Sequence, residues 1–290
     1  MPSLKDLKVR IKSVKSTQKI TKAMKMVAAS KLRRAREAAE ASRPYAVAME
    51  GMVARLAQGY SDIAHAPKLL AGTGKTDVHL IIAATADRGL CGAFNGSIVR
   101  GVRRRANELK AQGKTVYIYT IGRKGRDLLG ADFKSSIIGS KTDIARKTVE
   151  YDTAEAIAIE VLKLIETKKI DVVTVVYNHF KSAISQIVTY QNLMPLDVPA
   201  TAAKTDAVYD YEPDEEEILA DLLPRNFAMQ IFKALLESAA SEQGARMNAM
   251  ENATKNAGEM IKKLTLKFNR TRQANITREL IEIISGAEAL

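Results

Sequence analysis

The chain has 290 residues, of which 46% are hydrophobic, 27% charged and 5% aromatic, and its formal net charge is +12. Its hydrophobic content is that of a globular protein, while the low aromatic content and the lack of Trp favour helix-rich packing over a β-sandwich. The charge predicts an acidic partner, which could be nucleic acid, an anionic membrane surface or protein.

Apolar residues recur at spacings of three and four from the start of the chain, which predicts an amphipathic helix over residues 1–57. We expect Pro44 to kink or restart this helix, with Ser42 as a cap. A strict heptad repeat that begins at Leu4 places polar residues at three positions where a coiled coil requires apolar ones, namely Gln18, Thr21 and Lys25. This repeat predicts a poor zipper by itself, and a rod that lies inside or against other proteins.

The middle of the chain, residues 77–196, has a different pattern. Short β-branched, apolar runs alternate with helical segments, which is typical of an α/β domain with a largely parallel sheet. The predicted strands are VHLIIAAT (78–85), TVYIYTIG (115–122) and DVVTVVYNHF (171–180), and the predicted helices are 96–112, 122–130 and 153–168. The stretch SQIVTYQNLMPL could add an antiparallel edge strand.

A connector at residues 197–212 leads to a second long helix over residues 213–290, with apolar residues again at helical spacing. Gly244 and Gly258 weaken this helix by about 1 kcal/mol each relative to Ala. Both terminal helices are longer than the diameter of a small domain, roughly 30 Å, so we expect their apolar faces to pack on each other. The predicted fold class is therefore α/β, with a long antiparallel coiled coil of the N- and C-terminal helices and a Rossmann-like α/β domain.

The stretch GTGKT, residues 72–76, resembles the end of a phosphate-binding P-loop. A P-loop requires Gly where this chain has Leu69, and it opens a helix, whereas a strand follows here. A flexible loop is the better interpretation.

The stretch DRGLCGAFN, residues 87–95, lies between a strand and a helix, where a dinucleotide-binding turn would lie. Its glycine spacing is not GxGxxG, so a sharp turn permitted by Gly is the simpler interpretation, and a loop that touches a partner is the functional one. A catalytic thiol is not expected, because no base is identifiable. The single cysteine also excludes an intramolecular disulfide. The candidate residues of this loop, whose role is unassigned, are Asp87, Arg88, Gly89, Cys91 and Gly92.

The remaining titratable residues predict no chemistry. His65, His79 and His179 are too scattered for a metal site, and His79 in a strand pattern is best read as structural. The acidic run at residues 214–217 complements the dipole at the start of a helix. With no nucleophile–base or paired-carboxylate arrangement, we expect no catalytic residue, no metal and no cofactor.

The basic N-terminal helix has three interpretations. A nucleic-acid-binding helix would come with a known module or stacking aromatics, and the first aromatic residue is Tyr45. A membrane-surface helix would carry bulky apolar residues, whereas this face is rich in Ala, Val and Met, which suit close and adaptable protein contact. We expect a rod within an acidic-lined sleeve, with a merely solvated charged face as the alternative.

Together the two ends and the middle loop closely resemble the gamma chain of F-type ATP synthases, in the same order and over essentially the whole chain. The matching segments are SVKSTQKITKAMKMVAASKLRRA, DRGLCGAFN, SEQGARMNAMENATKNAGEMI and LKFNRTRQANITRELIEIISGAEAL. The resemblance implies a central rotor stalk, present in one copy, whose coiled coil lies inside a ring of three alpha and three beta subunits. It also implies a foot that joins the epsilon subunit and the membrane c-ring, with the delta subunit a further partner. Proton flow turns the c-ring, and nucleotide chemistry belongs to the beta subunits, so no catalytic role is expected for this chain.

The resemblance also implies contact residues. For the beta subunits these are Met24 in KAMKMV and, in TRQANIT and beyond, Arg272, Gln273, Thr277 and Glu279. For the c-ring side of the foot they are Tyr211 and Glu212 in YDYEP. Two alternatives stay open: Met24 could belong to the coiled-coil core, and Arg272 could be a solvated charge.

No apolar run approaches the roughly 18–20 residues of a membrane span, and the start lacks the apolar stretch of a secretory signal. From these residues we expect a soluble, cytoplasmic chain. The resemblance implies a peripheral protein on the cytoplasmic face of the bacterial plasma (inner) membrane, which touches the membrane only through the c-ring and binds no nucleic acid. The length and the missing transit segment favour a bacterial chain, with a processed organellar chain as the alternative. Two other classes remain as alternatives. One is a basic coiled-coil nucleic-acid binder with salt-dependent affinity, and the other is a nucleotide-dependent α/β enzyme that would need Lys75.

Overall fold

The computed structural model describes residues 3–59, 67–144, 148–196 and 214–288. Its elements are α1 (Leu4–Gly59), α2 (Lys68–Ala71), β1 (Val78–Ala84), α3 (Phe94–Ala111), β2 (Thr115–Ile121), α4 (Arg123–Phe133), β3 (Ile137–Lys141), α5 (Tyr151–Lys168), β4 (Val172–Phe180), β5 (Gln186–Met194) and α6 (Glu215–Glu288). They form two compact units: a coiled-coil unit, Met1–Ala28 with Arg246–Leu290, and a sheet unit, Ala29–Ala245. The predicted c-ring residues Tyr211 and Glu212 lie outside the described residues.

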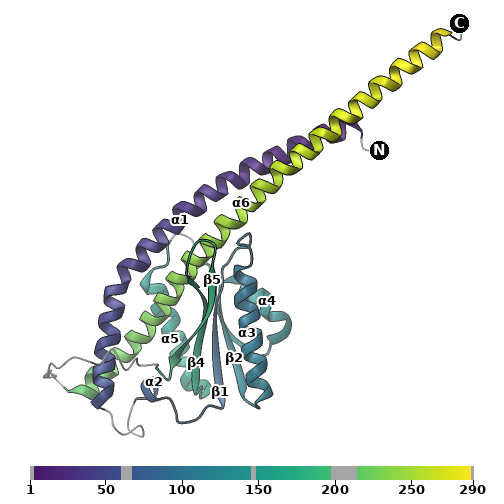
Figure 1. Cartoon of the computed structure of the whole chain (residues 1–290). Helices are drawn as coiled ribbons and strands as arrows, with labels where there is room; N and C mark the ends of the chain where they lie inside the picture. The colour runs from purple at the N-terminus through teal and green to yellow at the C-terminus, as the bar shows by residue number, and fades with distance from the viewer. Residues whose placement is uncertain (1–2, 60–66, 145–147, 197–213, 289–290) are drawn as a thin grey trace. The chain divides into compact units, whose positions relative to one another are not determined.

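The sheet unit is built on five strands in the order β3-β2-β1-β4-β5 (Figure 1). The pairs β1–β2, β1–β4 and β2–β3 are parallel, and β4–β5 is antiparallel. This arrangement confirms the predicted parallel α/β domain with an antiparallel edge. The sequence prediction omitted β3, whose run IIGSK is short and half-buried and contains Gly139, so it lacks the signature of a buried strand.

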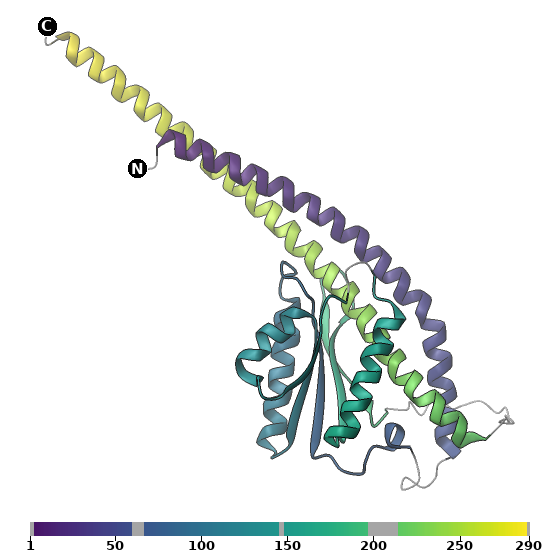
Figure 2. The ribbon, with the colours of Figure 1, turned by 180° about the vertical axis from the view of Figure 1, so that it is seen from behind.

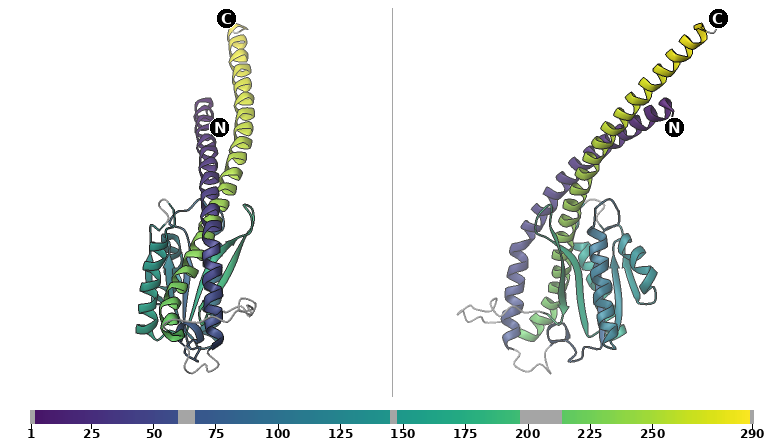
Figure 3. Two further views of the ribbon diagram at one scale, coloured as in Figure 1. Left: turned by 90° about the vertical axis from the view of Figure 1, so that its left-hand side faces the viewer. Right: turned by 45° about the vertical axis from the view of Figure 1, so that its right-hand side comes forward.

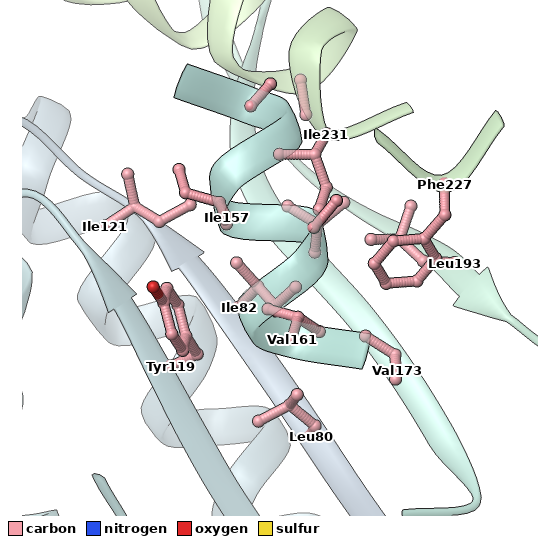
Figure 4. Packing of buried hydrophobic residues seen from close by; sticks show 14 of the residues in the cluster. Leu80, Ile82, Tyr119, Ile121, Ile157, Val161, Val173, Leu193, Phe227 and Ile231 are labelled. Atoms are coloured by element: carbon pink, nitrogen blue, oxygen red, sulfur yellow. The ribbon is translucent and has the colours of Figure 1, made fainter. Parts of the chain in front are cut away.

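Helices cover both faces of the sheet, with α3 and α4 on one face and α5 and the first part of α6 on the other (Figure 2). Successive residues of β1 serve opposite faces: Leu80 and Ile82 pack in the cluster under α5 and α6, whereas Ile81 packs in the cluster under α3. Figure 4 shows the first cluster, in which Ile157 of α5 and Ile231 of α6 meet the strands. Burial on both faces explains why the VHLIIAA run is apolar at every position except His79.

Of the two outcomes expected at Pro44, a kink or a restart, the restart was wrong, because α1 continues through Pro44. The kink stays a prediction. Ser42 does not cap a new helix, since its hydroxyl donates back to the Ala39 carbonyl at 3.0 Å within α1. The surrounding turns bury Ala46 and Met49. Tertiary packing of this kind stabilises a helix more than one missing backbone hydrogen bond weakens it.

Both long helices begin with side-chain caps. Ser3 and Asp6 form a capping box, in which the Asp6 amide donates to the Ser3 hydroxyl and the Ser3 amide to the Asp6 carboxylate, each at 3.1 Å. The Asp214 carboxylate accepts a 2.8 Å hydrogen bond from the Glu217 amide at the start of α6. The acidic run at residues 214–217 therefore includes a true N-cap.

In the coiled-coil unit α1 and α6 lie side by side (Figure 3). Thr21 contacts Thr254, and Lys25, later in α1, contacts Glu251, earlier in α6, so the two helices are antiparallel. Continuing this pairing places Leu4 opposite about residue 271. From there to its end, the described part of α6 has no opposite residue in the described part of α1. Among the described residues, no helix combines the length and the hydropathy needed to cross a membrane.

Candidate functional site

The place to look for a ligand in a sheet of this topology is the crevice beyond the carboxyl ends of the central strands. Here α6 occupies that crevice. Ser238 donates a 3.1 Å hydrogen bond to the carbonyl of Ala84, the last residue of β1, and Ser241 donates one of 2.7 Å to Asn178 near the end of β4. The cavity that remains beside Thr85, Gly122 and α6 has a volume of about 40 Å³. Small-molecule pockets measure roughly 300–1,000 Å³, so this cavity holds about one water molecule and no nucleotide.

The N-terminus of α4, beside the crevice, is also occupied. The amide of Arg123, the first residue of α4, donates to the Asp87 carboxylate at 2.9 Å, and the Gly125 amide donates to the Thr85 hydroxyl at 2.8 Å. These amides are the groups that would hold a phosphate. The backbone also comes very close here, because a Cβ on Gly122 would lie 2.2 Å from the Thr85 carbonyl oxygen. Thr85 and Asp87, which follow β1, therefore hold the turn before α4 in place.

Asn95 holds the loop from the other side. Its Oδ1 accepts a 2.9 Å hydrogen bond from the Ala86 amide, and its Nδ2 donates to the Arg88 carbonyl at 3.3 Å and to the Cys91 sulfur at 3.2 Å. Cys91 is 2% exposed, which agrees with a structural thiol rather than a reactive one. The sequence analysis did not single out Thr85 or Asn95; polar residues flanking a strand-to-helix turn are the signal that could have found them.

The outward face of the same loop is accessible. Arg88 and Gly92 are exposed, Asp87 and Gly89 are half-buried, and Leu90 is 65% exposed in a left-handed conformation with φ 62°. An exposed apolar side chain on a residue with a left-handed backbone, such as Leu90, is typical of a loop that contacts a partner. Contact of this loop with a partner stays a prediction.

The P-loop interpretation of GTGKT finds no support in the geometry. The four-residue helix α2 precedes the loop and strand β1 follows it, so the loop lies at the amino end of β1, opposite the edge where ligands bind. The first of its two threonines, Thr73, donates to the Asp171 carboxylate, and the amides of Asp77 and Val78 donate to the other oxygen at 3.0 Å each. Burial opposes ionisation of Asp171, but these hydrogen bonds outweigh it and hold its pKa below the ordinary value.

The histidines of the described residues do not form a metal site. No group of three His, Cys, Asp or Glu residues suited to a metal ion occurs in the part of the chain that the structure describes. His79 is buried, its Nε2 lies 3.0 Å from the Thr76 carbonyl oxygen, and burial lowers its pKa. His179 pairs through Nδ1 with Glu237 at 2.6 Å, which joins β4 to α6. His65 lies outside the described residues.

The end of α6 carries a cluster of accessible apolar side chains in the coiled-coil unit. Beyond about residue 271, where α1 no longer lies opposite, five apolar side chains are at least half exposed: Ile276, Leu280, Ile281, Ile283 and Ile284. We call residues 272–288 the tip of α6. The predicted contact residues within it, all exposed, are Arg272, Gln273, Thr277 and Glu279. Exposed apolar clusters of this kind mark interaction sites, so we expect a partner to cover this one.

The structure brings these four residues together on one helix segment but places Met24 elsewhere. Met24 is half-buried and lies next to Lys25, which occupies the heptad position opposite α6. Met24 therefore flanks the interface of the two helices, at a position that a further partner could still reach.

These features define a class of chain: an α/β domain that closes its own ligand crevice with a helix, and a coiled coil with an uncovered apolar tip. The family model for ATP synthase matches residues 3–290. The ATP synthase gamma chains of Rhodospirillum rubrum and Fuscovulum blasticum are 58% and 60% identical to this chain, and each alignment covers both chains completely. The chain belongs to the ATP synthase gamma-chain family.

Solved structures agree in fold. A chain of the cryo-EM structure of the Tetrahymena thermophila mitochondrial ATP synthase central stalk and c-ring has 35% identity and a TM-score of 0.63, covering 81% of this chain and 99% of that one. A chain of the Euglena gracilis mitochondrial ATP synthase has a TM-score of 0.69 at 22% identity, over 99% of this chain and 94% of that one. The first is similar in sequence and fold, and the second shows the fold.

Proposed function

We propose that this chain is the central rotor stalk of an F-type ATP synthase. It couples rotation of the membrane c-ring, driven by proton flow, to conformational change and ATP synthesis or hydrolysis at the beta subunits. One copy assembles with three alpha and three beta subunits, the epsilon and delta subunits and the c-ring, at the cytoplasmic face of a bacterial plasma (inner) membrane. It is a non-catalytic subunit of that complex. Its similarity to named gamma chains and to a central-stalk structure supports this assignment.

The observation that carries the proposal is the uncovered tip of α6. Its exposed isoleucines need a protein environment, and the adjoining part of α1 is strongly basic. A ring of subunits with an apolar sleeve and acidic loops meets both requirements. The basic residues of α1 before the pairing with Glu251 are Lys5, Lys8, Arg10, Lys12, Lys15, Lys19 and Lys22, against the single acid Asp6.

Coupling then follows from asymmetry. A coiled coil of two different helices presents a different surface in each direction, so each rotor orientation stabilises one set of conformations in the surrounding subunits. The same interaction acts in both directions, because a conformation that favours one orientation is favoured by it in turn. Nucleotide chemistry is assigned to the partners, consistent with a crevice that α6 fills in this chain.

The test is assembly from purified parts. The full chain is mixed with alpha and beta subunits of the same source, and the mass of the complex and its ATPase activity are measured. We expect one copy per three alpha–beta pairs and the appearance of activity. A control coiled-coil protein of matched length and charge separates shape recognition from simple charge attraction. If competent subunits form no complex with this chain, or respond equally to the control, the proposal is wrong.

A further inference from the structure

The three polar heptad positions of α1 all meet residues of α6. The side chains at Thr21 and Lys25 contact Thr254 and Glu251, and Gln18 lies beside Thr254. We call these five residues, together with Gly258, the polar seam. Thr21 is only 8% exposed, whereas the side chains of Lys25 and Glu251 are 39% and 34% exposed, so the seam is buried at the threonines and partly solvated at the ion pair. What the sequence predicts as a defect in the zipper is a set of matched contacts.

The threonines form the most buried contact of the polar seam. Their hydroxyl oxygens lie 2.8 Å apart, and each is also within hydrogen-bond distance of a carbonyl of its own helix, Gln18 at 3.1 Å for Thr21 and Met250 at 2.7 Å for Thr254. A hydroxyl has one proton to donate, so one threonine donates across the seam while the other donates within its helix. Opposite an apolar residue each hydroxyl could still donate within its own helix, but neither oxygen would accept a hydrogen bond across the seam.

The other two contacts are equally specific in position. Lys25 and Glu251 form an ion pair, and the hydrogen bond from Lys25 lowers the pKa of Glu251. The Gln18 amide donates to the Thr254 carbonyl at 3.5 Å, where a Cβ on Gly258 would lie 3.1 Å from Nε2. Gly258, which costs helix stability, therefore leaves room for the glutamine side chain.

Apolar contacts do not distinguish one heptad from the next, because burial of apolar surface has no direction. A shift by one heptad would place Thr21 opposite Met247 or Ile261, and in the latter case Lys25 opposite Gly258. None of these offers a hydroxyl or a carboxylate. Such a shift would also move the tip of α6 by about 10 Å along α1, away from its place relative to Met24.

We infer that the polar seam determines the alignment of the coiled coil. Gln18, Thr21 and Lys25 select one register against Glu251, Thr254 and Gly258, at the expense of the stability that apolar residues would give. Polar residues at seam positions of coiled coils act in this way, and replacement of buried polar pairs by apolar residues is often neutral or stabilising.

The test measures alignment in the full chain by disulfide cross-linking. Val14 and Ile261 lie one heptad from Thr21 and Thr254, so the Val14→Cys/Ile261→Cys pair reports the native register. The pairs Val14→Cys/Phe268→Cys and Leu7→Cys/Ile261→Cys report shifts by one heptad in the two directions. With the native seam only the first pair should cross-link. In an apolar variant, T21V/T254V/K25M/E251M, cross-linking of the shifted pairs should rise about tenfold, with no loss of thermal stability.

Matched variants separate specificity from packing. The swap K25E/E251K keeps an ion pair, and T21S/T254S keeps both hydroxyls, so both should retain the native cross-link alone. If the apolar variant does not fold, the half-variants T21V/T254V and K25M/E251M give the same readout with smaller increases. The inference would be overturned if, in every apolar variant, the yield of the two shifted cross-links stayed as low as in the chain with the native seam. Contacts elsewhere, such as Glu50 with Gln230, would then set the alignment. The inference would also be overturned if K25E/E251K raised the yield of shifted cross-links as much as the apolar variant does.

Discussion

Ser241 of α6 donates a 2.7 Å hydrogen bond to the backbone carbonyl of Asn178 in β4, and its side chain is completely buried. Three residues earlier, Ser238 makes the same kind of bond to the end of β1. Together the two serines fasten α6 across the carboxyl edge of the sheet. The position of this helix, and thus the closure of the crevice, depends on small polar side chains that the apolar pattern of the helix does not reveal.

Ser241→Ala should lower the free energy of unfolding of the full chain by about 1–2 kcal/mol, because the Asn178 carbonyl would lose its donor in a buried place. Urea unfolding followed by circular dichroism measures this. Ser30→Ala, an exposed serine of the sheet unit, is the matched control and should change stability by less than about 0.5 kcal/mol. Equal effects of the two substitutions would contradict the role of Ser241.

Two glycines, one at the N-cap of α4 and one within α4, should respond in opposite ways to alanine. Gly130 lies within α4 with open space around its missing Cβ, so Gly130→Ala should stabilise the chain by up to about 1 kcal/mol. Gly122 has φ 89°, and its added Cβ would meet the Thr85 carbonyl, so Gly122→Ala should destabilise by about 2 kcal/mol or more. Thermal unfolding distinguishes the two, and a stabilised Gly122→Ala would show that the turn before α4 can relax.

Asp171 should make stability depend on pH in the acid range. Its pKa in the folded chain lies below the unfolded value near 3.8, so ionised Asp171 stabilises the fold fully above that value. The contribution is lost as the pH falls through the lowered pKa of the folded state. We expect wild type to be more stable than Asp171→Asn at pH 6, and the difference to shrink below pH 3.8. Urea midpoints measured across this range check the prediction, and a difference that is constant with pH would contradict it.

Met24→Lys should leave the chain folded and impair coupling in the assembled complex. Met24 is half-buried beside Lys25, so a second cation there would disturb both the ion pair with Glu251 and any subunit that packs on this side. The ratio of proton pumping to ATP hydrolysis in reconstituted vesicles is the measurement. Met26→Lys, two residues away and 61% exposed, is the control. Unchanged coupling in Met24→Lys would remove Met24 from the proposed contacts.

Arg272→Ala should weaken assembly with alpha and beta subunits, by about fivefold in affinity if one charged contact is lost. The comparison is Lys263→Ala, an exposed cation in the part of α6 that α1 accompanies. Titration of the labelled chain into the alpha–beta subunits, with ATPase activity as a second readout, gives both values. If the two variants lose the same affinity, Arg272 acts only through general charge and is otherwise solvated.

The sequence predicted the fold class well because its evidence is local. Apolar, β-branched runs such as that of β1 and the heptads of α1 can be recognised within a window of about ten residues. The family resemblance agrees with the comparisons. The filling of the crevice was not predictable, since Ser238 bonds a carbonyl 154 positions away in the chain. The matched partners of the polar seam were missed for the same reason, because Thr21 and Thr254 are separated by 233 positions. The contact roles of Met24, Arg272, Gln273, Thr277 and Glu279 stay predictions that assembly will test.

The helix that fills the crevice of this sheet differs from a bound cofactor in one thermodynamic respect. A dissociable ligand stabilises its protein in proportion to the logarithm of its concentration, so dilution empties the site. α6 is tethered to the sheet by its own chain, and its local concentration is set by the length of the connection rather than by the solution. Occupancy of the crevice by α6 should thus be the same at any dilution of the chain and at any nucleotide concentration in the cell. This behaviour is required of a subunit that must stay rigid while nucleotides bind and leave its partners.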